Sequence, residues 1–235
     1  MSKIRVLYQY LIALPILLVL TVLCAVITLL AFPWKNSWWL NRVQALWARM
    51  WCYLTFVPVK MVGLEHIRQH QSYVFVANHQ SNFDIFVLYG WLPVVFKWLM
   101  KKEMSHIPVV GLACRAAGHI FIDRRHAKAA THSLQAVEEQ LKDGVSTVIF
   151  PEGTRSHDGQ MGAFKRGAFQ IAWDLNLPVI PICLDGCYQV MNRFAKSVTP
   201  HPITATILPE MDLHQYATME ESIKAVRDVI ATAQH

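Results

Sequence analysis

Two polar stretches of this chain carry residue types suited to proton transfer and to anion binding. In "VANHQSNFD", residues 76–84, a β-rich run ends at His79, and Asp84 follows five residues later. In "STVIFPEGTRS", residues 146–156, a similar run leads into Glu152 and Arg155. An imidazole oriented by a carboxylate can act as a general base, and a guanidinium fork suits phosphate. The two stretches therefore predict a catalytic base and an anion-binding group.

His79 and Asp84 can meet only if the chain turns between them. A continuous strand would put them on opposite faces, and a continuous helix would separate them by roughly 140°. The intervening "QSN" suits a turn, and we expect Asn82 to cap a helix with Asp84 in its first turn. One ring nitrogen would then face the carboxylate and the other a cleft. Taken alone, this spacing more often marks a histidine hydrogen-bonded to a helix cap.

A third polar stretch, "GHIFIDRR" at residues 118–125, contains Arg124 at a predicted strand end. Taken singly, the strand end at Arg124 could be a surface ion pair, and the one at Glu152 and Arg155 a charged turn. Three of them at one rim of a parallel sheet instead indicate a ligand site, because ligands bind there. The chain has no G-x-S-x-G elbow, no phosphate loop and no spacing typical of metal ligands. We therefore expect a proton taken from a substrate hydroxyl or a water, with no metal and no cofactor.

The elements that must position these residues show alternating periodicities. Short β-rich runs appear in the order "YVFVA", "VVFKWLM", "HIFI", "STVIF", "PVIPICL" and "ITATIL". Helical spacing of apolar residues predicts helices within 127–144, over 164–175 and over 219–233. Strands that alternate with helices predict an α/β domain with a mainly parallel sheet flanked by helices, which we place at residues 63–235.

The N-terminal region has a different character. No charged residue occurs from Val6 to Trp34, and as a helix this stretch would reach roughly 35–40 Å, enough to cross a bilayer core. A tryptophan-rich, amphipathic stretch follows at residues 37–59. Basic residues flank both ends, so a hairpin bent at Pro33 fits the charges better than a single span. A cleaved signal peptide fits poorly, because no small-residue cleavage site follows. We expect residues 1–62 to form a membrane-embedded two-helix motif.

Composition agrees with a membrane protein on the reducing side of a membrane. The apolar fraction is 54%, the charged fraction is 16%, and the net charge of +6 favours anionic partners. The five cysteines are odd in number and form no C-x-x-C pair, so reduced thiols fit better than disulfides. No basic and aromatic motif of a known nucleic-acid reader is present, so we expect no nucleic acid.

Four stretches in order resemble the motifs of the glycerolipid acyltransferase family: "NHQSNFD", "GHIFIDR", "FPEGTRS" and "LPVIPICLDG" at residues 177–186. "KKEMSHIPVVG", residues 101–111, is similar to a further block of this family. All four motifs in order are far more specific than any one alone. Asn78 before the histidine is more like the 1-acylglycerol-3-phosphate acyltransferases than the glycerol-3-phosphate acyltransferases. The resemblance implies an α/β fold behind two helices embedded in one leaflet.

The resemblance also implies roles. His79 would deprotonate the sn-2 hydroxyl of lysophosphatidic acid, and Asp84 would orient the imidazole and stabilise its charge. The hydroxyl would attack an acyl thioester, acyl-CoA or acyl carrier protein, to give phosphatidic acid. The substrate phosphate would be held by three cations, Lys101, Arg124 and Arg155. Beside them, Glu152 would position Arg155 or the glycerol backbone, and the Gly153 and Thr154 backbone would approach the ligand. The implied location is the cytoplasmic face of a membrane, in bacteria the inner membrane.

Three other functions remain open from the sequence. A related acyltransferase would use another lysolipid or glycerol-3-phosphate as acceptor. A hydrolase would use His79 to activate water. A non-catalytic lipid-binding membrane protein fits least, because docking on lipid needs no general base.

Overall fold

The strands of this protein form one seven-stranded sheet in the order β1-β7-β6-β2-β5-β3-β4. The computed structural model describes residues 3–34, 37–107, 110–122, 138–141 and 144–234. The strands are β1 (Val59–Val62), β2 (Val74–Ala77), β3 (Phe96–Lys101), β4 (Ile120–Ile122), β5 (Ser146–Ile149), β6 (Val179–Asp185) and β7 (Ile203–Ile207). Adjacent strands are parallel except β6 and β7, which run antiparallel. The predicted α/β fold with a mainly parallel sheet is confirmed.

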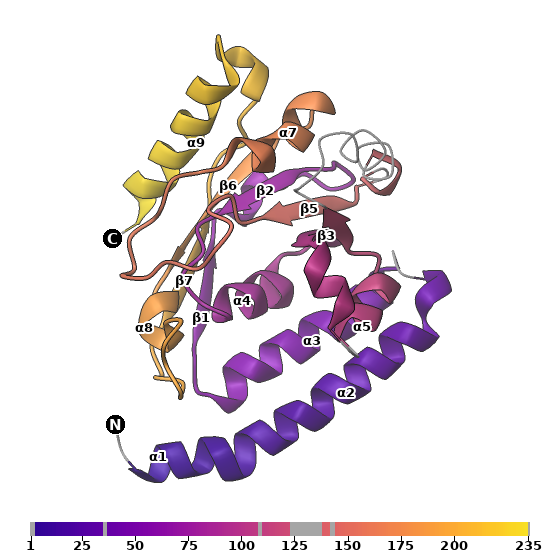
Figure 1. Ribbon diagram of the computed structural model, residues 1–235, viewed down its shortest axis with the longest axis vertical. Helices are drawn as coiled ribbons and strands as arrows, with labels where there is room; N and C mark the ends of the chain where they lie inside the picture. Colours follow the sequence, from indigo (N-terminus) through magenta and orange to yellow (C-terminus); the bar gives the residue numbers. More distant parts are fainter. Residues whose placement is uncertain (1–2, 35–36, 108–109, 123–137, 142–143, 235) are drawn as a thin grey trace.

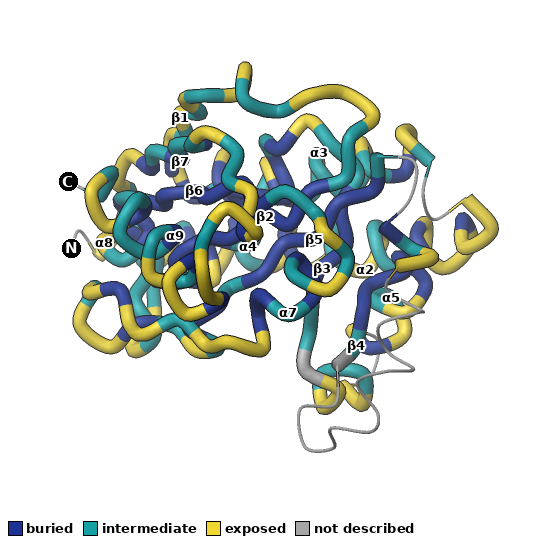
Figure 2. The backbone as a smooth tube through the Cα atoms, turned by 90° about the horizontal axis from the view of Figure 1, so that it is seen from above, coloured by how far each residue is buried: buried dark blue, intermediate teal, exposed yellow. Residues whose placement is uncertain are grey.

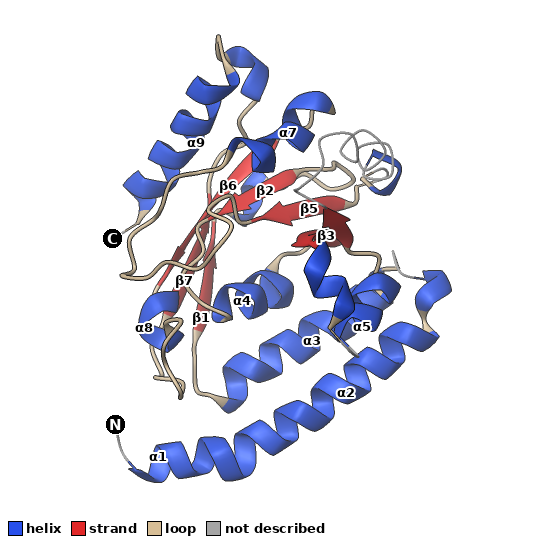
Figure 3. Ribbon diagram, viewed as in Figure 1, coloured by secondary structure: helices blue, strands red, loops and turns tan. Residues whose placement is uncertain are grey.

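Helices cover both faces of this sheet (Figures 1 and 3). The longer ones in the α/β part are α4 (Phe83–Trp91), α5 (Val110–Ala116), α7 (Arg166–Asp174), α8 (Cys187–Met191) and α9 (Met219–Ala233). On β2, Phe75 and Ala77 pack in the apolar cluster under α4 and α8, whereas Val74 and Val76 pack under α7 and α9. Because both faces are covered, β2 at the centre of the sheet is apolar at every position. Figure 2 shows these buried strands at the centre of the molecule.

The six β-rich runs found in the sequence all form strands, β2 to β7. The helices expected at 164–175 and 219–233 are α7 and α9. Most of the helix expected within 127–144 lies outside the described residues. One strand was missed: β1 is short and lies at the sheet edge, where Lys60 and Val62 are exposed. The sheet therefore begins at Val59, before the domain boundary expected at residue 63.

The N-terminal region folds as two helices, as predicted. The first combines α1 (Lys3–Tyr8), a π-helical turn η1 (Gln9–Ala13) and α2 (Leu14–Leu30) into one helix of 28 residues. Among the described residues it is the one helix long and apolar enough to cross a membrane. A turn containing Pro33 leads to α3 (Trp38–Leu54), which packs between α2 and α4 (Figure 1). The indole N–H of Trp47 on α3 donates to Thr21 on α2 at 2.9 Å.

Candidate active site

His79 and Asp84 meet through a turn at the carboxyl end of β2. The Nδ1 of His79 lies 2.7 Å from the Oδ2 of Asp84, in the first turn of α4. The same oxygen accepts from the backbone N–H groups of Gln80 at 2.6 Å and Ser81 at 2.8 Å. Because a carboxylate oxygen that receives these donors is an acceptor, Nδ1 carries the proton and Nε2 keeps its lone pair. The turn expected between the two residues is confirmed.

The cap of α4 differs in one residue from the prediction. Asn82 occupies the N-cap position, but its side chain makes no capping hydrogen bond. The hydroxyl of Ser81 instead accepts from the backbone N–H of Phe83 at 3.1 Å and donates to the Met191 carbonyl at 2.7 Å. A single hydroxyl therefore caps the helix and ties the turn to the segment after β6.

Both neighbouring strands hold the end of β2. The amide of Asn78 exchanges two hydrogen bonds with the backbone of Leu184 on β6, at 2.8 and 2.7 Å. On the other side, the backbone N–H of His79 donates to Glu152 at 2.7 Å, and its carbonyl accepts from the N–H of Ser156 at 2.8 Å. The polar segment after β5 thus lies directly beside His79, as the convergence of strand ends predicts.

The hydrogen bonds of Glu152 go to backbone N–H groups and not to Arg155. Its Oε1 accepts from the backbone of His79, and its Oε2 accepts from the Gly162 N–H at 2.8 Å. Burial raises the pKa of the Glu152 carboxyl, and these two N–H donors oppose that shift. Its carboxylate thus positions the strand end that carries His79. Within the described residues, the guanidinium of Arg155 has no hydrogen bond or ion pair with Glu152 or any other side chain.

An aromatic ring fixes the plane of the imidazole. Phe150 stacks on His79 with ring centroids 4.0 Å apart and planes at 12°, and Trp98 stacks behind Phe150 at 5.5 Å. The flat stack restricts rotation of the imidazole about the Cβ–Cγ bond of His79 and covers one face of the ring. Phe150 is not among the site residues predicted from the sequence. The only signal was its place as the first residue after β5.

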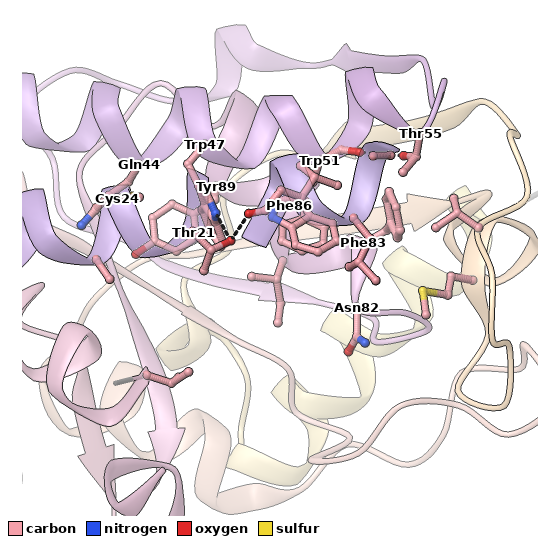
Figure 4. A pocket seen from close by; sticks show the side chains of 18 of the residues that line it. Thr21, Cys24, Gln44, Trp47, Trp51, Thr55, Asn82, Phe83, Phe86 and Tyr89 are labelled. Carbon is pink, nitrogen blue, oxygen red and sulfur yellow. Dashed lines mark hydrogen bonds between the residues drawn. The ribbon is translucent and has the colours of Figure 1, made fainter. Parts of the chain in front are cut away.

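An apolar cavity of about 570 Å³ adjoins the start of α4 and lies between the N-terminal helices, α4 and α5. Figure 4 shows rings of Trp47, Trp51, Phe86 and Tyr89 among the side chains around it, with Asn82 and Phe83 at one side. Asn82 and Phe83 precede Asp84 directly, whereas His79 and Asp84 themselves do not line the cavity. Its volume falls in the range of about 300–1,000 Å³ typical of small-ligand pockets.

The cavity lining contains a buried pair of polar groups from Tyr89 and His119. The hydroxyl of Tyr89 and the Nε2 of His119 lie 2.7 Å apart, and both residues line the cavity. Burial, reinforced by the nearby Lys97, lowers the pKa of His119 to about 3. His119 is therefore neutral at physiological pH and serves as a hydrogen-bonding partner.

The other predicted site residues are placed less fully. Gly153 adopts φ of 72°, a left-handed conformation that favours glycine, and Thr154 is exposed beside it. Lys101 is the last residue of β3, and Arg124 lies outside the described residues. The structure thus brings together His79, Asp84, Glu152 and the turn that leads to Arg155.

The fold and the order of these motifs agree with known proteins. The sequence model of a family described as Acyltransferase matches residues 58–185, from just before β1 to the end of β6. This chain belongs to the acyltransferase family. The matched residues include the whole His79–Asp84 turn and the segment after β5.

Relatives in this acyltransferase family extend the agreement. A 1-acyl-sn-glycerol-3-phosphate acyltransferase of Limnanthes douglasii is 32% identical over 176 residues, 74% of this chain and 62% of that protein. A human protein of the same name, the alpha form, is 35% identical over 67% of this chain and 56% of its own length. Another from Chlamydomonas reinhardtii is 31% identical over 99% of this chain and 70% of its own length. The chain thus spans between about half and two-thirds of most curated relatives it matches.

A solved structure matches almost the whole chain. The 1-acyl-sn-glycerophosphate (LPA) acyltransferase PlsC from Thermotoga maritima is 26% identical in sequence, with a TM-score of 0.82. The match covers 99% of this chain and 97% of that one, and so includes the N-terminal helices as well as the sheet.

Proposed function

We propose that this protein transfers an acyl chain from an acyl thioester to the sn-2 hydroxyl of 1-acyl-glycerol-3-phosphate, which gives phosphatidic acid. The hydrogen bond between His79 and Asp84 carries this proposal, because it leaves Nε2 of the imidazole with a lone pair for a substrate proton. The names of the relatives described above support the same reaction.

In the proposed mechanism, Nε2 of His79 takes the proton of the acceptor hydroxyl as its oxygen attacks the thioester carbonyl carbon. Asp84 stabilises the imidazolium that forms, and the stacked ring of Phe150 keeps the imidazole in place. When the tetrahedral intermediate collapses, the carbon–sulfur bond breaks and the imidazolium returns the proton to the thiolate. This cycle forms no acyl-enzyme, and it uses neither a metal nor a cofactor.

We assign the acceptor phosphate to Arg155, with Arg124 and Lys101 as further cations. Arg155 is supported by its guanidinium, which no described side chain neutralises, and by the hydrogen bond that its neighbour Ser156 makes to His79. Gly153, with its left-handed backbone, and the exposed Thr154 come directly before Arg155, and we propose that their backbone approaches the same ligand. Acyl-CoA and acyl carrier protein are both suitable donors, and the apolar cavity suits an acyl chain.

We place the helix Lys3–Leu30 and α3 in one leaflet on the cytoplasmic side of a membrane, in bacteria the inner membrane. The apolar side chains exposed along the first helix support this, since their exposure to water would be unfavourable. A tag at the N-terminus should then be accessible from the cytosolic side. Labelling of the tag only from the opposite side would support a true span instead.

The reaction is tested by incubating membranes that contain the protein with lysophosphatidic acid and acyl-CoA or acyl carrier protein. We expect phosphatidic acid from the wild type and a loss of about 10²–10⁴-fold in His79→Ala, the usual contribution of a general base. Formation of phosphatidic acid at equal rates by both proteins would refute the mechanism. Release of free fatty acid without phosphatidic acid would indicate a hydrolase.

A further inference from the structure

The loop after α8 exposes an aromatic side chain between two cations. Phe194 is 67% exposed, the most of any large hydrophobic side chain described after α3. Arg193 precedes it, with the guanidinium 5.4 Å from the ring, and Lys196 follows. The sequence from Gly186 to Pro209 contains no aspartate or glutamate. We call residues 192–198 the cationic loop. An exposed aromatic beside cations is unfavourable in water but suits the boundary between lipid headgroups and acyl chains.

Hydrogen bonds join this cationic loop to the N-terminal apolar helix. The amide of Gln9 donates to the Val198 carbonyl at 2.7 Å and accepts from the Val198 N–H at 3.1 Å. The hydroxyl of Tyr10 donates to the Lys196 carbonyl at 2.5 Å. Gln9 begins the π-helical turn η1, a feature often found where a helix presents a functional side chain. The side-chain amide of Gln9 therefore joins the loop to the helix.

The same end of the helix exposes apolar side chains and cations. Ile4, Leu7 and Leu11 are 79%, 59% and 65% exposed, and Lys3 and Arg5 lie beside them in sequence. Gln9 lies roughly 9 Å along the helix axis from Lys3. A bilayer that accepts this apolar face would place the cationic loop close to the headgroups, because the hydrogen bonds prevent the loop from moving independently of the helix.

We propose that the cationic loop is a second membrane contact, with Phe194 in the bilayer interface and Arg193 and Lys196 on anionic lipid headgroups. An acidic protein such as the acyl donor's carrier would also suit the cations. The bilayer is favoured because the loop is hydrogen-bonded to the exposed apolar helix and because its aromatic side chain, Phe194, is 67% exposed. This inference rests on the membrane placement proposed above and does not depend on the reaction.

The loop also connects the membrane to the catalytic turn. The carbonyl of Met191, the last residue of α8, accepts a hydrogen bond from the hydroxyl of Ser81 at 2.7 Å. Arg193 contacts the imidazole of His157 at 2.5 Å, one residue beyond the motif that contains Arg155. Lys196, Ser197 and Val198 line the apolar cavity. Contact of the loop with lipid would therefore hold the cavity and the turn at a fixed depth relative to the acceptor.

The experiment measures the depth of residue 194 in a bilayer. Phe194→Cys in the full chain is labelled with an environment-sensitive fluorophore and reconstituted into vesicles of phosphatidylcholine with or without phosphatidylglycerol. The matched control is Asp228→Cys, whose side chain is 48% exposed. It lies on α9, a helix across the sheet from the N-terminal helices (Figure 1). Unsubstituted protein taken through the same labelling corrects for the native cysteines. Quenching by nitroxide-labelled lipids is compared with quenching by an ion confined to water.

We expect nitroxide lipids to quench the label at 194 several-fold more than the label at 228, and the aqueous quencher to show the reverse. The double change Arg193→Glu with Lys196→Glu should reduce lipid quenching at 194 in anionic vesicles. Equal access of the aqueous quencher to both labels would overturn the proposal. Aqueous access at 194 that is lost only after addition of acyl carrier protein would assign the loop to a protein partner and would also overturn it. Neither result depends on whether phosphatidic acid is formed.

Discussion

Asp84→Asn is the sharpest perturbation of the catalytic turn. The Oδ2 of Asp84 receives three donors, the imidazole of His79 and the N–H groups of Gln80 and Ser81. An asparagine can keep all three if its carbonyl oxygen replaces Oδ2, whereas the opposite orientation would set its NH₂ against those donors. The turn should therefore persist, and only the negative charge is removed.

The structure sets the size of both expected effects. Hydrogen bonds to a charged group contribute about 1.5–3 kcal/mol, against about 0.5–1.5 kcal/mol between neutral groups. Weakening the two backbone bonds should thus lower the free energy of unfolding by about 2 kcal/mol. The imidazolium loses its counter-charge, so we expect kcat to fall by about 10²–10⁴-fold. Asp84 is fully buried and lies outside the cavity lining, so KM for lysophosphatidic acid should change little.

The assay is phosphatidic acid formation in membranes, with chemical denaturation in mild detergent as the measure of stability. Asp174→Asn is the matched control. Asp174 is an exposed carboxylate that accepts a hydrogen bond from the side-chain amide of Gln170. The control should keep both activity and stability. His79→Ala combined with Asp84→Asn should be no slower than His79→Ala alone, since the two residues act as a unit. Unchanged kcat in a folded Asp84→Asn protein would refute the role assigned to the carboxylate.

Three further changes test other parts of the site. In Glu152→Gln, the backbone N–H of either His79 or Gly162 must face the new NH₂. The free energy of unfolding should therefore fall by about 1–3 kcal/mol, and an unchanged denaturation midpoint would contradict this. His119 has a folded pKa of about 3 against an unfolded value of 6.5, so only the unfolded state gains its proton between these values. Stability should therefore fall by about 2 kcal/mol on acidification to about pH 5, and a His119→Gln protein should lack that part of the slope in denaturation curves. Arg155→Ala should raise the apparent KM for lysophosphatidic acid more than that for the thioester; equal increases would remove the phosphate assignment.

The sequence predicted the parts of this structure that depend on periodicity and on local turn chemistry. The runs that became β2 to β7 are rich in apolar and β-branched residues because the strands pack against helices, and that pattern is visible in the sequence. The turn between His79 and Asp84 was predicted from the polar "QSN" between them and from the requirement that the two side chains meet. The edge strand β1 was missed because it has only four residues, and two of them, Lys60 and Val62, are exposed. It therefore shows no continuous apolar run.

Contacts between distant segments had no local signal. The partner of the Asn78 amide is Leu184, and the partner of the Ser81 hydroxyl is Met191, each more than a hundred residues away. Similarly, the stack of Phe150 on His79 depends on β5 lying next to β2, an order that the sequence does not encode in any short motif. No short motif gives the position or depth of the cavity, because its walls come from helices spread over most of the chain.

The role of Glu152 shows why a charged pair in sequence need not be an ion pair in space. Two backbone N–H groups, from His79 and Gly162, bond to different oxygens of the buried Glu152 carboxylate, whereas a neutral amide would offer an oxygen to one of them and an NH₂ to the other. The requirement for Glu152 thus comes from the backbone around the base. It follows that Glu152 does not neutralise Arg155, because both oxygens of its carboxylate accept backbone N–H groups. Loss of Glu152 should therefore affect the position of His79 and so kcat, while loss of Arg155 should affect binding of the phosphate.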